Sequence, residues 1–177
     1  MKFLRMVPTF LFLIATSFPL GALDFDLGFS PGGTALKDVV AAIGTAKQTV
    51  VVAAYEFTSA EVAQALTEAV ARGIKVWAVL DRRASHEKYS QAGYLADHGV
   101  SVRTDGHYAI FHHKFLVVDR TTVQTGSFNY TLSADKRNAE NVLVLRDVPD
   151  LADAYLKEWT RLWDEADPWA PAASLPR

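Results

Sequence analysis

The chain has no cysteine among its 177 residues. It therefore cannot form disulfides, cannot bind a metal through thiolates and cannot use a thiol as a nucleophile. Covalent catalysis, if it occurs, must depend on another side chain. An exported protein can fold without disulfides, so this absence leaves export open.

The chain also lacks an excess of basic residues, because 18 Lys and Arg stand against 20 Asp and Glu, giving a net charge of −2. This balance is unexpected for an enzyme acting on nucleic acid. A binding groove needs only a local positive field, however, so the balance does not exclude one. If the chain binds a nucleic acid, the candidates for contacts to its phosphates are Arg82, Arg83, Arg103, Lys136 and Arg137.

Long apolar runs are missing except at the N-terminus. There Lys2 and Arg5 precede an apolar stretch over 6–20, and two small residues follow at 21–22. This is the layout of a secretory signal peptide, so we expect residues 1–22 to be removed and the protein to be periplasmic or secreted. The alternative is a retained membrane anchor, which the short stretch and its two prolines disfavour. Without Lys2 and Arg5, the net charge is −4.

The remaining chain shows no repeat, linker or low-complexity tract. Residues 23–170 suffice for one domain with a proper core, followed by a flexible Pro- and Ala-rich tail over 171–177. Helices are expected over residues 35–47 (with Thr34 as a possible N-cap), 59–72, 85–98 and 150–163, and strands over 49–57, 74–80, 100–103, 115–118, 121–125 and 141–145. This alternation predicts an α/β fold, a layered α/β/α sandwich around a mixed, mostly buried sheet.

One short segment carries most of the chemistry. His112 and Lys114 lie two residues apart next to an expected strand, so their side chains should share a face, while His113 should point the opposite way. A tight turn over 119–121 would fold residues 126–129 back beside them. The imidazole of His112, the ammonium of Lys114 and the polar groups of Ser127 and Asn129 would then converge on a site suited to a phosphate.

These residues form the patterns His112-x-Lys114-x₄-Asp119, Gly126-Ser127-x-Asn129 and Glu140-Asn141. In this order they resemble the HKD signature of the phospholipase D superfamily, and especially its small secreted bacterial nucleases. The likeness runs from about residue 28 and is densest between residues 110 and 163. The resemblance implies a phospholipase D-like fold and phosphodiester hydrolysis without a metal or another cofactor.

The resemblance also implies a role for each residue. His112 would attack phosphorus to form a phosphohistidine, and a second motif histidine would protonate the leaving oxygen. Lys114 and Asn129 would bind the non-bridging oxygens, and Ser127 would add a hydrogen bond. Glu140 would orient the nucleophilic histidine, and Asp119 would have a supporting role close to the site. Family members also place substrate-facing residues where Tyr55 and Glu56 end the first expected strand.

Elementary chemistry agrees with this reading. A phosphodiester repels nucleophiles by its own charge, so a catalyst must neutralise the equatorial oxygens and hold an attacking atom in place. A neutral imidazole is available near neutrality, because the reference pKa of histidine is about 6.5. A second imidazole can act as general acid and then as general base.

Only one HKD motif is present. Because the chemistry needs two histidines at one phosphate, we expect a two-fold symmetric homodimer in which His112 of each copy faces the same phosphorus. The function that follows is a metal-independent, non-specific endonuclease acting on DNA, or on both DNA and RNA. Three alternatives stay open: a phospholipase D acting on lipid head groups, a nucleic-acid-binding module with an inactive site, and a processing enzyme for one particular nucleic acid.

Overall fold

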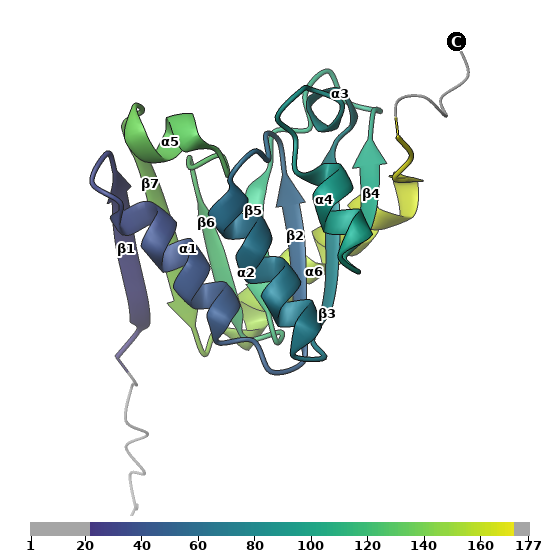
Figure 1. The fold of residues 1–177 in the computed structure, drawn as a ribbon. Helices are drawn as coiled ribbons and strands as arrows, with labels where there is room; N and C mark the ends of the chain where they lie inside the picture. Colours follow the sequence, from purple (N-terminus) through teal and green to yellow (C-terminus); the bar gives the residue numbers. More distant parts are fainter. Residues whose placement is uncertain (1–21, 172–177) are drawn as a thin grey trace, which may run out of the picture.

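The computed structural model describes residues 22–171 and contains one mixed sheet (Figure 1). The strand pairs β2–β3 and β3–β4 are parallel, and every other neighbouring pair is antiparallel. The architecture confirms the predicted α/β fold around a mixed sheet. In spatial order the strands are β1 (Asp24–Ser30), β7 (Glu140–Arg146), β6 (Thr122–Gly126), β5 (Lys114–Val118), β2 (Thr49–Ala54), β3 (Lys75–Asp81), β4 (Ser101–Asp105) and β8 (Asp167–Pro168).

Helices cover the two faces of the sheet unequally. Helices α1 (Thr34–Gly44), α2 (Ala60–Ala71) and α4 (Ala92–Asp97) pack on one face, and α6 (Pro149–Glu165) crosses the other. Figure 1 shows α6 behind the half of the sheet that contains β2 and β3. The short helices α3 (Arg82–Ser85) and α5 (Leu132–Lys136) lie at the edge where β2 and β3 end.

The central strands are apolar on both faces because each face packs against helices. Along β2, Val50 and Val52 belong to the core under α1 and α2, whereas Val51 and Ala53 belong to the core under α6. Trp159 fixes α6 to the sheet through a hydrogen bond from its Nε1 to the carbonyl of Val52, at 2.8 Å. The apolar runs of the sequence are therefore explained by two cores that share one sheet.

Local contacts fix both ends of α2, and the tight turn expected over 119–121 is confirmed. Ser59 caps α2 by accepting a hydrogen bond from Val62 N, and Gly73 follows the helix with a φ of 86°. In the β5–β6 hairpin, Asp119 and Arg120 have φ values of 50° and 59°. A tight hairpin turn with two positive φ values matches the right-handed twist of the strands, which fixes the register of this pair.

The prediction of one helix over residues 85–98 is wrong. Asp81 ends β3 and caps a short helix by accepting from Ala84 N at 2.8 Å, so helical structure begins early at Arg82. That helix stops at Ser85, and α4 begins only at Ala92, after Gln91 N has bonded to the carbonyl of Phe57. The two ends are thus tied to β3 and to the segment after β2, and the chain between them cannot stay helical.

Thr34 is not the N-cap of α1, which is Gly33. The Thr34 hydroxyl instead exchanges hydrogen bonds of 2.8 Å with the backbone N–H and carbonyl of Phe29, which ties α1 to the end of β1. Strand β1 was not predicted at all. It pairs along its length with β7, and Gly28 lets α1 approach closely, since a Cβ there would lie 2.8 Å from Ala35.

The predicted signal peptide and C-terminal tail lie outside the described residues, except for Ala22 and Pro171. Within residues 22–171, no helix is long and apolar enough to cross a membrane.

Candidate active site

The predicted catalytic segment lies at the edge of the sheet that is formed by strand ends, where β5 and β7 begin and β2 and β6 end. Register pairs Lys114 of β5 with Ala54 of β2, and Gly126 of β6 with Val142 of β7. Antiparallel pairing therefore returns the residues after Gly126 to the level of Lys114. The hairpin geometry expected from the sequence is confirmed.

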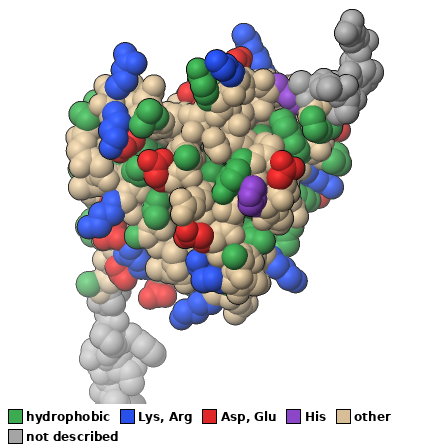
Figure 2. All heavy atoms as spheres, in the orientation of Figure 1, with side chains coloured by type: hydrophobic (Ala, Val, Ile, Leu, Met, Phe, Trp, Pro, Cys, Tyr) green, Lys and Arg blue, Asp and Glu red, His purple; other side chains and the backbone are tan. Residues whose placement is uncertain are grey.

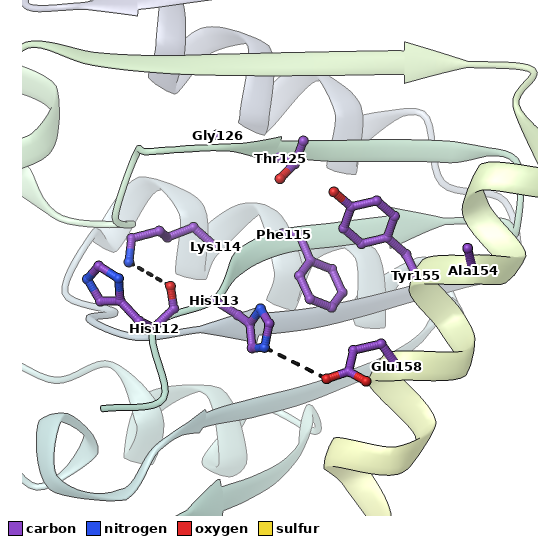
Figure 3. Close-up of a pocket in the computed structure, with 9 residues that line it drawn as sticks. All are labelled: His112, His113, Lys114, Phe115, Thr125, Gly126, Ala154, Tyr155 and Glu158. Carbon is purple, nitrogen blue, oxygen red and sulfur yellow. Dashed lines mark hydrogen bonds and ion pairs between the residues drawn. The ribbon is translucent and has the colours of Figure 1, made fainter. Parts of the chain in front are cut away.

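His112 and Lys114 lie close together at this edge (Figure 3). Lys114 Nζ donates to the backbone carbonyl of His112 at 2.9 Å and stands 5.3 Å from the centre of the Tyr55 ring. The Tyr55 ring is also 5.1 Å from the imidazole of His112. Burial lowers the pKa of Lys114, although the charges of Glu140 and Glu56 oppose this shift. The ammonium group is thus partly shielded from water, so its charge interacts strongly with a bound anion.

His113 points to the α6 side, as alternation predicted (Figure 3). Its ring packs edge-on against Phe111 and Phe115, with centroids 5.3 and 5.5 Å away. Its Nε2 lies 4.0 Å from Glu158 Oε1, and burial lowers the pKa of His113. The expected register of His112 and Lys114 is therefore the observed one.

Glu140 is joined to the GSxN segment. Its carboxylate accepts hydrogen bonds from the Ser127 hydroxyl at 2.5 Å and from Asn138 Nδ2 at 2.9 Å, and the Ser127 oxygen accepts from Asn141 N at 3.1 Å. No hydrogen bond joins Glu140 to His112 within the described chain. The orienting role of Glu140 stays a prediction. Asn138 and the backbone of Asn141 are contributors that sequence reasoning missed.

Asn129 points away from the core because successive side chains of the segment 128–130 point to opposite sides. Phe128 and Tyr130 are fully buried in the core, as expected for the residues that flank Asn129. Gly126 is required here, because at its φ of 153° a Cβ would lie 2.2 Å from the carbonyl oxygen of Asn141. Asn129 Oδ1 is buried and has no hydrogen-bond partner among the described residues. The other side of this amide is its NH₂ group, which is the donor that a phosphate oxygen needs.

Asp119 lies away from this cluster. It follows the far end of β5, five residues from Lys114, which corresponds to about 16 Å along a strand. Its carboxylate accepts three hydrogen bonds of 2.8 Å from the backbone N–H groups of Lys47, Gln48 and Thr49. The expected position close to the site is therefore wrong, and the observed contacts hold the α1–β2 connection.

Replacing Asp119 with Ala should lower the free energy of unfolding by about 1–3 kcal/mol, because three backbone donors lose a charged acceptor. Catalytic turnover of the folded protein should change less than about twofold, since this turn does not reach the site. Urea unfolding and a turnover assay on the same preparation measure both effects. A large loss of turnover at full stability would assign Asp119 to the chemistry after all.

The five predicted basic contacts divide into two groups. Arg82 pairs with Asp167, and Arg103 lies over the ring of Trp163, 4.6 Å from its centre, so both are used within the fold. Figure 2 shows Lys and Arg side chains along the upper edge of the molecule, near α3 and α5. Three basic residues at this edge remain available to bind a substrate phosphate: Arg83, Lys136 and Arg137. Lys136 pairs with Asp135 but stays mostly exposed.

Two hollows, that is, surface pockets, adjoin the cluster formed by His112, Lys114, Ser127 and Asn129. The first, of about 440 Å³, lies between the segment 112–115, the end of β6 and α6 (Figure 3). The second, of about 410 Å³, lies beyond Tyr55 at the carboxyl ends of β2 and β3. Within residues 22–171, no three His, Asp or Glu side chains are grouped as a metal ion would need.

The comparisons with known proteins fit this geometry. Residues 39–163 match the family model described as cardiolipin synthase, PLD-like domain. The chain belongs to the phospholipase D superfamily. The structure of Nuc, a phospholipase D family member from Salmonella typhimurium, superimposes with a TM-score of 0.81 at 37% identity, covering 84% of this chain and 99% of Nuc. The phospholipase D-like fold expected from the motif is thus confirmed.

Curated relatives from this superfamily have different names. A phospholipase D of Rickettsia bellii is 39% identical over 131 residues, which cover 74% of this chain and 65% of the relative. A mitochondrial cardiolipin hydrolase of Xenopus laevis is 41% identical over 114 residues, which cover 64% of this chain and 54% of the relative. The chain therefore spans less than two thirds of the length of these relatives, and their names leave the substrate of this chain open.

Proposed function

We propose that this protein is a metal-independent phosphodiesterase that cleaves nucleic acid with little sequence specificity. The proposal rests on His112 and Lys114 at the start of β5 (Figure 3) and on Ser127 and Asn129, which follow the end of the paired strand β6. An imidazole nucleophile, a cation and neutral donors at one point suit attack on a charged phosphodiester. Arg83, Lys136 and Arg137 at the same edge support a polyanionic substrate.

In this account, neutral His112 attacks phosphorus, and the bond to the leaving alcohol breaks as a second imidazole donates a proton to its oxygen. That second imidazole then takes a proton from water, whose oxygen attacks phosphorus and releases His112. Lys114 and Asn129 bind the non-bridging oxygens throughout. Glu140, with Ser127 bonded to it, supplies a carboxylate for the imidazolium that forms.

The second imidazole must come from a second copy of the chain, because no other histidine of the chain is positioned for the role. His113 faces α6, His86 stacks on Trp169, and His98 binds the carbonyl of Tyr94. His107 is bound to Asp105 at the end of β4, three strands from β5, or about 14 Å. The homodimer expected from the single motif is therefore part of this proposal.

A surface suited to that dimer lies beside the site. Phe25, Leu27 and Phe29 alternate along β1 toward the face that α6 occupies elsewhere, and each is 51–54% exposed. Leu143 and Leu145 pair with Leu27 and Phe25 in the next strand and continue the row. An apolar row of this regularity on an open sheet face is typical of a protein interface. β1 also ends at the site, since Ser30 pairs with Glu140.

The direct test is incubation of the purified protein with plasmid DNA in excess EDTA. We expect nicking to continue unchanged, because none of the proposed steps uses a metal ion. Nicking should also weaken steeply between 50 and 200 mM salt, as phosphate contacts require. Loss of all cleavage on chelation would contradict the proposal.

A second candidate function is hydrolysis of phospholipids, and a specific observation favours it. Ile110 and Leu132 are 53% and 62% exposed, one just before His112 and the other in α5. Exposed apolar residues around a site can contact a lipid surface. Intact plasmid together with release of head groups from vesicles would select this function over the nuclease.

A further inference from the structure

The hollow beyond Tyr55 is separate from the residues proposed to handle the phosphate. Tyr55 and Glu56, which follow β2, form one wall. Arg83 and Glu87, in and after α3, form a second wall, and Ile110 belongs to the third. The volume of about 410 Å³ lies in the range of small-ligand sites.

The walls are held in place without a ligand. Asp81 is 5% exposed and accepts hydrogen bonds from Ala84 N at 2.8 Å and from Phe111 N at 3.0 Å. One carboxylate thus ties α3 to the loop before His112. A hollow whose walls are fixed in this way is preformed, which lowers the entropic cost of binding.

Tyr55 joins the hollow to the phosphate site. Its ring lines the hollow and contacts the imidazole of His112, with 5.1 Å between the ring centres. Its backbone N–H donates to the carbonyl of His113 at 2.9 Å, which fixes this end of β2 against the catalytic segment. A group bonded to a phosphate at His112 can therefore extend past Tyr55 into this hollow.

Apart from Asp81, the charged side chains that line the hollow have no hydrogen-bond or ion-pair partner among the described residues. In the part of the chain that the structure describes, Glu56, Glu87 and Arg83 form no side-chain hydrogen bond or ion pair. An ionised carboxylate can only accept, so the two glutamates suit a ligand with N–H donors. Arg83 suits an anion, and the ring of Tyr55 offers a flat surface for stacking.

A nucleotide combines these properties, because its base is planar, its amino group donates and its phosphates are anionic. Cytosine, adenine and guanine have an exocyclic amino group, whereas thymine and uracil do not. An ammonium head group would satisfy the glutamates and can lie over the Tyr55 ring, but it would leave Arg83 without an anionic partner. The contents of the hollow thus favour a nucleoside unit.

We infer that this hollow holds the base next to the scissile phosphodiester and prefers bases with an amino group, which Glu56 and Glu87 recognise. The inference rests on the proposed nuclease function. Cleavage is then mostly non-specific, with a preference at one flanking position. A carboxylate accepting from an amino group gives a preference of about fivefold to tenfold for cytosine over thymine, at the low end of good base contacts.

The test uses single-stranded oligonucleotides with one cleavable linkage, flanked by cytosine or thymine on either side. The wild-type kcat/KM should favour cytosine on one side by about fivefold to tenfold. Glu56→Gln should reduce this preference at least about twofold and leave the rate on thymine within about twofold, because an amide can pair with either base while Glu87 is retained. Glu68→Gln is the matched control, since Glu68 bonds Gln64 on α2, outside the hollow.

A binding measurement separates the two proposals. Titration with dCMP and dTMP, observed at the Ile110 methyl groups, should show tighter binding of dCMP and a smaller difference in Glu56→Gln. Cleavage without any base preference would overturn the inference and leave the nuclease standing. Selective binding without cleavage would keep the inference and refute the nuclease. Release of ethanolamine from phosphatidylethanolamine vesicles that depends on Glu56 would replace the base with a head group and overturn the inference.

Discussion

His112→Ala is expected to lower the rate of phosphodiester cleavage by at least about 10³-fold, because it removes both the nucleophile and the general acid of the proposed symmetric site. Folding should be little affected, since the imidazole lies at the sheet edge and makes no side-chain hydrogen bond within the described chain. A turnover assay with a matched thermal unfolding curve measures both.

His113→Ala is the control for this prediction, because it makes the same change one residue away. His113 packs on Phe111 and Phe115, so its loss should lower the free energy of unfolding by about 1–3 kcal/mol. Turnover of the folded protein should stay within about threefold. If His113→Ala removed activity and His112→Ala did not, the assignment of the nucleophile would be reversed.

Leu27→Asp is expected to convert the proposed dimer into monomers and to reduce turnover by a similarly large factor. In the single chain Leu27 is 51% exposed, so a carboxylate there is tolerated. In the proposed interface the same carboxylate would be buried without a partner, which costs several kcal/mol. A monomer would then have only one of the two imidazoles that the reaction needs.

Sedimentation velocity and turnover at the same concentrations test this prediction. Tyr94→Asp is the matched control, because Tyr94 is 40% exposed on α4, on the other face of the sheet. An active monomeric Leu27→Asp protein would refute the shared site. A variant that stays dimeric and active would refute the β1 surface alone.

The sequence alone was sufficient to predict the parts of the site that depend on the spacing of nearby residues. Alternation on an extended segment separates His112 from His113, and the tight turn at Asp119 brings Ser127 and Asn129 back to Lys114. Buried strands such as β2 were likewise predictable, because they follow from continuous apolar runs.

Contacts between distant segments were not predictable in the same way. Asp119 binds the backbone of residues 47–49, and Arg103 stacks on Trp163, and both contacts exist only once the sheet is assembled. The alternation of Phe25, Leu27 and Phe29 was visible in the sequence, yet it signals a strand only when its partner β7 is known. The division of 85–98 into two helices likewise depends on Asp81 and Phe57.

The central claim is that two copies of His112 act on one phosphate, and mixed dimers test it most directly. Wild-type and His112→Ala chains are unfolded together in equal amounts, refolded and assayed per total chain. If each site needs two intact histidines, only wild-type pairs are active, and about a quarter of the wild-type rate should remain. If each chain acted alone, about half would remain, and that result would contradict the account.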